Sequence, residues 1–110
     1  MTGVELIAVE RKRQIDVEGW TPEHDDAHES SEMSGAAIAY AGMANRVIRY
    51  ANDMSDEELS RVVEWVPNDW PLQWSTDWWK PSLHPIRNLV KAGALIAAEI
   101  DRLQRKGGGQ

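Results

Sequence analysis

The sequence contains no cysteine and no phenylalanine, and none of its apolar runs approaches the roughly 20 residues that span a bilayer. Without cysteine the chain can form neither a disulfide scaffold nor a cysteine-ligated zinc site, and it has no thiol nucleophile. Basic residues are also few, because 12 Lys and Arg stand against 18 Asp and Glu, for a formal net charge of −6. Since affinity for nucleic acid comes largely from cations that neutralise phosphates, we expect no duplex nucleic acid as a partner. The first residues lack the apolar core of a signal peptide, so we expect a cytoplasmic protein without membrane contact.

What the sequence does contain predicts an all-α fold, a small helical bundle with a long loop rich in Trp and Pro. With 110 residues the chain can bury one modest core but not two. We therefore expect one helical domain over residues 1–106, followed by a flexible tail over 107–110.

Two helices are expected in the first half of the chain. Thr2 and Glu5 have the spacing of a capping box, which predicts a helix over 3–17. A second helix is expected over 27–51, where small residues dominate and would let a neighbouring helix approach closely. A break near Gly42 is an open alternative, because glycine costs about 1 kcal/mol relative to alanine inside a helix.

The second half predicts a short helix, a long loop and a final helix. Ser55 and Glu58 form another capping box, which opens a helix that ends near Trp65. Residues 66–85 carry four Pro and four Trp without a period, and so long a connection is more often functional than incidental. The last helix is expected over 85–105. Its expected apolar face consists of Ile86, Leu89, Val90, Gly93, Ala94, Ala97, Ile100 and Leu103.

The tryptophans of this loop are the most unusual feature of the sequence. Trp70, Trp74 and Trp78 recur at every fourth residue, and Trp79 and Lys80 follow. Indole rings offer flat faces for stacking a nucleobase, and a nearby lysine can meet a phosphate. The alternative is that these rings cover the open edge of a bundle that has no phenylalanine to fill it.

Two arginines in the first helix extend this hypothesis. Arg11 falls on the apolar stripe of that helix, where its charge needs either a carboxylate, for which Glu18 and Glu32 are candidates, or an anionic ligand. The candidate ligand-binding residues are Arg11, Arg13, Trp20, Trp74, Trp78, Trp79 and Lys80.

Acidic and histidine residues between the first two helices raise the question of a metal. Glu29 and Glu32 are spaced i,i+3 and would share a helix face, where two carboxylates can hold Mg²⁺ if other oxygens complete the shell. The alternative is a solvated first turn in which acids suit the helix dipole. His24 and His28 can bind a transition metal if a helix begins before His24, or they serve as caps.

Blocks of sequence resemble a group of small phage- and prophage-encoded proteins. The resemblance rests on the stretches ERKRQ, EGWTPEHDDAH, WWKP and RNLVKAGALIAAEIDRL, and it covers most of the chain. It implies a phage accessory protein that acts in the host cytoplasm.

The first half is also similar in layout to phage MazG-like nucleotide pyrophosphohydrolases. In both, an E-R-x-R-Q helix precedes a turn with Gly and Trp, a His, and a helix bearing E-x-x-E, here Glu29 and Glu32. That family is a helical bundle, often dimeric, which holds Mg²⁺ with a second acidic pair on a later helix. Here Glu99 and Asp101 are spaced i,i+2 and do not share a face, so the resemblance implies weak Mg²⁺ binding and poor hydrolysis.

A shorter likeness, carried by Glu18, Gly19, Trp20 and Asp26, is to the ryanodine-receptor repeat domain, some members of which are associated with nucleotide ligands. No Walker loop, G-x-G-x-x-G, G-x-S-x-G or H-E-x-x-H motif is present.

Three functions are therefore carried forward. The favoured one is non-catalytic binding of a nucleotide-type small molecule, with sequestration of a host immune signal as its role and with no cofactor. The first alternative is a Mg²⁺-dependent MazG-like pyrophosphohydrolase, and the second is an acidic inhibitor of a host defence enzyme. A homodimer is compatible with the first two, because long faces of Ala and Gly often complete their core across a two-fold axis.

Overall fold

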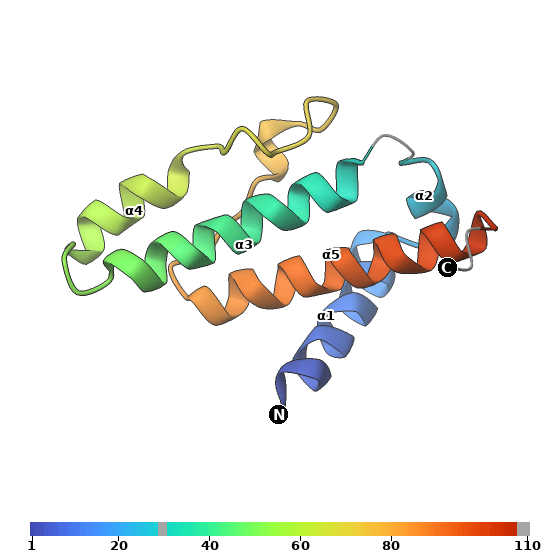
Figure 1. The fold of residues 1–110 in the computed structure, drawn as a ribbon, viewed down its shortest axis with the longest axis horizontal. Coiled ribbons are helices and arrows are strands. Elements are labelled where there is room, and N and C mark those ends of the chain that lie inside the picture. The colour runs from blue at the N-terminus through green and yellow to red at the C-terminus, as the bar shows by residue number, and fades with distance from the viewer. Residues whose placement is uncertain (29–30, 108–110) are drawn as a thin grey trace.

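A computed structural model describes residues 1–28 and 31–107, and within these ranges the chain is helical and contains no strand, which confirms the all-α prediction (Figure 1). The elements are α1 (Gly3–Glu18), α2 (Pro22–Asp26), α3 (Glu32–Tyr50), α4 (Asp56–Glu64), the 3₁₀ helix η1 (Thr76–Trp78) and α5 (Pro85–Arg105). The predicted tail falls mostly on residues 108–110, outside the described residues. None of the helices in the described ranges combines the length and apolar character needed to cross a membrane.

Both predicted capping boxes are confirmed. The Thr2 hydroxyl accepts a hydrogen bond from the Glu5 backbone N–H at 3.2 Å, and the Glu5 carboxylate accepts one from the Thr2 N–H at 2.9 Å. Ser55 and Glu58 repeat this arrangement at the start of α4. At the other end of α1, Gly19 adopts a left-handed conformation with φ of 74°, and its N–H donates to the Gln14 carbonyl. Glycine adopts this conformation without the steric cost that a Cβ would add.

The expected single helix over 27–51 is wrong at its N-terminal end. A separate short helix, α2, precedes α3 and is capped by Thr21. Pro22 takes its first position, where a backbone N–H would have no partner inside the helix, so the N–H that proline lacks is not needed. Ser31, which precedes α3, has a left-handed φ of 66° that interrupts any continuous helix from α2. The alternative of a break near Gly42 is also wrong, because α3 runs through that residue without interruption.

The core lies mainly between α3 and α5, which run antiparallel and side by side (Figure 1). Ala36, Ala37 and Ala44 of α3 and Ala92 and Ala98 of α5 are buried, so small residues allow the two helices to approach closely. Helix α1 crosses α5 at Gly93, where an added Cβ would lie 2.5 Å from Cδ1 of Ile7.

The expected apolar face of α5 is largely wrong. Val90 and Ala94 are buried as expected, but the other buried positions include Ala92, Leu95 and Ala98, which turn toward α3. Alanines are prominent among the buried residues of α3, and the mostly small buried side chains of α5 pack against this helix together with Leu95. Five large aliphatic side chains of α5 remain exposed: Ile86, Leu89, Ile96, Ile100 and Leu103.

The loop over 66–85 packs onto α3 and fixes the site described below. Trp70, Trp74 and Trp79 are buried, and the Trp79 indole N–H donates to the Val63 carbonyl at 3.2 Å. The loop backbone lies against α3 itself, because a Cβ added to Gly35 would be 2.8 Å from the Asp69 carbonyl oxygen. Part of the tryptophan cluster therefore completes the core, as the second of the two interpretations expected.

Candidate ligand-binding pocket

A pocket of about 340 Å³ lies where α1, the segment containing α2, α3, the tryptophan loop and α5 meet. Helix α1 contributes Glu10, Gln14 and Glu18, which are spaced four residues apart and so lie on one face, with Arg13 beside them. Apolar surface makes up most of the lining, which is typical of sites for small organic ligands.

Aromatic rings form one wall of this pocket. The ring centroids of Trp20 and Trp74 are 6.3 Å apart, and those of Trp74 and Trp78 are 5.8 Å apart. Trp74 is buried, whereas Trp78 is 54% exposed and therefore lies at the open side of the pocket. A flat ligand can therefore reach an indole face without unfolding the core.

Glu10 is the buried anion of the pocket. Its carboxylate accepts hydrogen bonds from Arg13 on α1, at 2.9 Å for each oxygen, and from Arg87 on α5 at 2.6 Å. Burial alone would raise the pKa of Glu10, but the hydrogen bonds from these two guanidinium groups outweigh it and lower the pKa. Glu10 is therefore ionised at neutral pH and ties α1 to α5.

Arg13 is held by carboxylates on both sides. Besides Glu10, it donates to Glu18 at 3.1 Å, and the pKa of Arg13 is raised, chiefly by its hydrogen bond to Glu10. An anionic ligand at Arg13 would have to compete with these two carboxylates.

Two lysines supply the other positive charges of the lining. Lys91 Nζ donates to the Lys80 carbonyl at 2.7 Å and lies 5.3 Å from the centre of the Tyr40 ring. Burial, assisted by the nearby charge of Arg87, lowers the pKa of Lys91. The Tyr40 hydroxyl accepts a hydrogen bond from the Lys80 N–H at 3.2 Å, which fixes the loop against α3.

Two buried polar atoms of pocket residues lack a hydrogen-bond partner within the part of the chain that the structure describes. They are Oε1 of Gln14, an acceptor, and Nε1 of Trp74, a donor. Buried polar groups are normally satisfied, and leaving one unpaired costs about 1–3 kcal/mol. Both residues line the cavity, and a ligand could pair with these two atoms once a local shift of the side chains exposes them.

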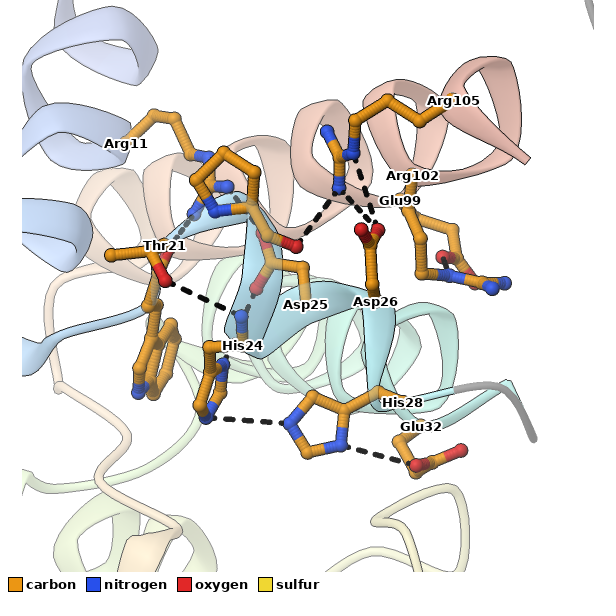
Figure 2. A network of polar contacts seen from close by, with 12 residues as sticks. Arg11, Thr21, His24, Asp25, Asp26, His28, Glu32, Glu99, Arg102 and Arg105 are labelled. Atoms are coloured by element: carbon orange, nitrogen blue, oxygen red, sulfur yellow. Dashed lines mark hydrogen bonds and ion pairs between the residues drawn. The ribbon is translucent and has the colours of Figure 1, made fainter. Parts of the chain in front are cut away.

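A histidine pair forms the rim between α2 and α3 (Figure 2). The Nε2 atoms of His24 and His28 are 3.4 Å apart, and Nδ1 of His28 is 3.1 Å from Oε2 of Glu32. His24 Nδ1 lies 3.5 Å from Oδ1 of Asp25, a buried carboxylate. Helix α2 begins at Pro22, before His24. This is the condition under which the sequence predicted that His24 and His28 could act as a pair.

The structure brings five of the seven predicted ligand-binding residues into this pocket: Arg13, Trp20, Trp74, Trp78 and Lys80. The other two, Arg11 and Trp79, do not line it. Arg11 forms an ion pair with Asp25 and donates to the Trp20 carbonyl at 3.2 Å, so its carboxylate partner is Asp25 rather than Glu18 or Glu32 (Figure 2).

Several lining residues were not predicted as ligand-binding. Two signals were available: the i,i+4 spacing of Glu10, Gln14 and Glu18, and the position of Lys91 directly before the alanine-rich middle of the last helix. Tyr40 carried no such signal, because its place depends on how the loop packs onto α3.

The predicted magnesium ligands are only partly visible. Glu29 lies outside the described residues, and the Glu32 carboxylate is bonded to His28. On the later helix, Glu99 pairs with Arg102 at 2.5 Å. Within residues 1–28 and 31–107, no group of three or more His, Cys, Asp or Glu residues is arranged to hold a metal ion. A Mg²⁺ site therefore stays a prediction.

Comparisons of the chain with protein-family models, with curated proteins and with solved structures give no match.

Proposed function

We propose that this protein binds a nucleotide-type small molecule in the pocket without turning it over. The observation that carries the proposal is the convergence, in one cavity of about 340 Å³, of indole rings, lysines and two unsatisfied polar atoms. This volume lies at the lower end of the range typical of small-molecule sites, about 300–1,000 Å³, and so favours a ligand with one nucleotide unit inside the cavity.

The chemistry of the lining matches the parts of a nucleotide. The base would stack on Trp78 or Trp20. After a local shift of the side chains, Gln14 Oε1 would accept from an exocyclic amino group and Trp74 Nε1 would donate to a ring nitrogen. The phosphate would lie at Lys80 and Lys91.

Two observations support binding without catalysis. Both carboxylates among the described pocket residues, Glu10 and Glu18, are hydrogen-bonded to Arg13, which leaves them poorly placed to ligate Mg²⁺. The later helix also lacks the second acidic pair of the MazG-like enzymes that the first half resembles.

The resemblance to phage-encoded proteins extends this proposal to a biological role. A phage protein that holds a nucleotide signal tightly would lower its free concentration in the host cytoplasm and silence the defence that responds to it. The proposal thus joins a binding pocket to the sequestration of a host immune signal.

The test is a thermal-shift screen against mono-, di- and cyclic nucleotides, with and without Mg²⁺, followed by calorimetric titration and chromatography of each hit. A ligand at a hundred times its dissociation constant adds about 2.7 kcal/mol of stability, a shift of several degrees for a domain of this size. We expect a shift with the nucleotide recovered intact.

The matched variants are Trp78→Ala in the pocket and Trp65→Ala outside it, because the two residues are 54% and 55% exposed. Loss of a stacking indole costs about 1–3 kcal/mol, so Trp78→Ala should weaken binding about 5- to 150-fold while Trp65→Ala leaves it unchanged. A hydrolysed product whose formation is abolished by Glu32→Ala would establish the pyrophosphohydrolase instead. No shift with any nucleotide, together with salt-sensitive co-purification of a host protein, would support the inhibitor.

A further inference from the structure

The histidine pair at the pocket rim carries an inference beyond nucleotide binding. We propose that His24 and His28 form a two-histidine site for a transition-metal dication such as Zn²⁺, held through their Nε2 atoms. The two Nε2 atoms are 3.4 Å apart and the rings meet edge to face, with centroids 4.6 Å apart.

The carboxylates beside the two rings indicate which nitrogen of each ring carries the proton. Nδ1 of His28 lies 3.1 Å from the Glu32 carboxylate, which accepts hydrogen bonds only, so this nitrogen bears the hydrogen. Nδ1 of His24 faces the Asp25 carboxylate at 3.5 Å, which favours the same tautomer. In both neutral rings Nε2 then carries a bare lone pair, and neither nitrogen can donate a hydrogen bond to the other. Either a proton added to one ring or a metal cation bound to both nitrogens relieves the repulsion between these lone pairs.

The distance between the two Nε2 atoms also suits a metal ion. A tetrahedral Zn²⁺ ion binds histidine nitrogen at about 2.0–2.1 Å, and two such ligands are therefore about 3.3–3.4 Å apart. The separation of the two Nε2 atoms matches this value. The two nitrogens need no change of separation, and the rings need only tilt so that both lone pairs point at one ion, which brings their centroids from 4.6 Å to about 5.2 Å apart.

Carboxylates lie behind both rings, on the side away from the Nε2 atoms. Histidines that bind metals usually donate their other N–H to a carboxylate, which fixes the ring and increases its basicity. Glu32 and Asp25 take these positions here, and Asp25 is itself anchored by Arg11 of α1 (Figure 2). The His28 N–H also donates to the Asp25 carbonyl at 3.0 Å, which joins the two histidines through one turn of backbone.

The remaining coordination positions would open toward the pocket, because both rings belong to its lining. Sites with open positions accept water or an anionic oxygen of a ligand. With only two protein ligands, we expect affinity in the micromolar range, well below that of a closed four-ligand site. The site stands independently of the nucleotide proposal, since the metal ligands are protein atoms.

The test is calorimetric titration of the full chain with ZnCl₂ at pH 7.5 in a non-coordinating buffer, with no nucleotide present. The variants are His24→Ala and His28→Ala, and the control is His84→Ala, which removes an exposed histidine outside the pocket lining. We expect one Zn²⁺ per chain, at least tenfold weaker binding in each pocket variant, and no change in the control. Circular dichroism of each variant verifies that it is folded.

A second readout assigns the nitrogens. Long-range ¹H–¹⁵N spectra of the histidine rings should show that Zn²⁺ changes the Nε2 signals of His24 and His28 and leaves their Nδ1 atoms protonated. Absence of saturable binding, or binding that both pocket variants retain, would overturn the proposal. So would ring spectra of the wild type that stay unchanged with Zn²⁺. No nucleotide is present in these measurements. A negative result would therefore count against the metal site alone and would leave the nucleotide proposal to its own thermal-shift screen.

Discussion

At the residue scale, Glu10 shows how a buried carboxylate is compensated by its hydrogen-bond partners. Its carboxylate lies in the interior, yet it is shared by Arg13 and Arg87, whose side chains are partly exposed and stay hydrated on their outer side. The cost of burying one carboxylate is thus offset by two charge-assisted hydrogen-bonded partners. The same contacts tie α1 to α5 on one wall of the pocket.

We expect Glu10→Gln to lower the free energy of unfolding at pH 7 by about 2 kcal/mol, because hydrogen bonds to a charged acceptor are replaced by weaker ones. The folded-state pKa of Glu10 lies below its ordinary value of 4.5, so the stabilisation is complete above that pH and is lost as the pH falls through the folded-state pKa. Urea denaturation of both proteins between pH 7 and pH 2.5 measures this. The difference should shrink below about pH 4.5, and a difference that is constant over the range would contradict it.

At the element scale, α3 contains two glycines in very different surroundings. A Cβ at Gly35 would lie 2.8 Å from the Asp69 carbonyl, whereas a Cβ at Gly42 would meet nothing within 4 Å. Gly35 therefore permits the tryptophan loop to lie directly on the helix, and Gly42 has no such role.

Alanine substitution of these two glycines should change stability in opposite directions. Gly42→Ala should stabilise the protein by about 0.5–1 kcal/mol through helix propensity, and Gly35→Ala should destabilise it by about 1–3 kcal/mol because the loop must shift. Chemical denaturation measures both changes, and each variant is the control for the other. Equal stabilisation by the two substitutions would show that the loop does not rest on α3 in solution.

The same elements show which features could be predicted from the sequence. Signals within a few residues succeeded: both capping boxes and the start of the last helix at Pro85 were predicted from local spacing. Contacts between residues far apart in the sequence could not be predicted from local spacing. Packing of whole elements decides that Arg11 pairs with Asp25 and that the Tyr40 hydroxyl meets Lys80. Nor could the periodic pattern of α5 indicate which of its sides faces α3.

At the scale of the whole molecule, the orientation of α5 leaves an apolar surface without a partner among the described residues. Its exposed aliphatic side chains fall in a row that α1 crosses at Gly93: Ile86 and Leu89 lie before the crossing, and Ile96, Ile100 and Leu103 lie after it. A homodimer, which the sequence analysis already considered, would cover this row with the same row of a second copy around a two-fold axis.

We therefore expect the wild-type protein to sediment as a dimer at micromolar concentration and Ile100→Glu to shift it toward monomer. Each buried isoleucine contributes about 1.5–3 kcal/mol, and a two-fold interface contains it twice, so the dissociation constant should rise by at least a hundredfold. Ile48→Glu on α3 is the matched control, since Ile48 is 59% exposed and Ile100 is 51% exposed, but only Ile100 belongs to the row. Analytical ultracentrifugation across a concentration series distinguishes the two variants. If Ile48→Glu dissociates the dimer equally, the row on α5 is not the interface, and if the wild type is monomeric throughout, the pocket must act within a single chain.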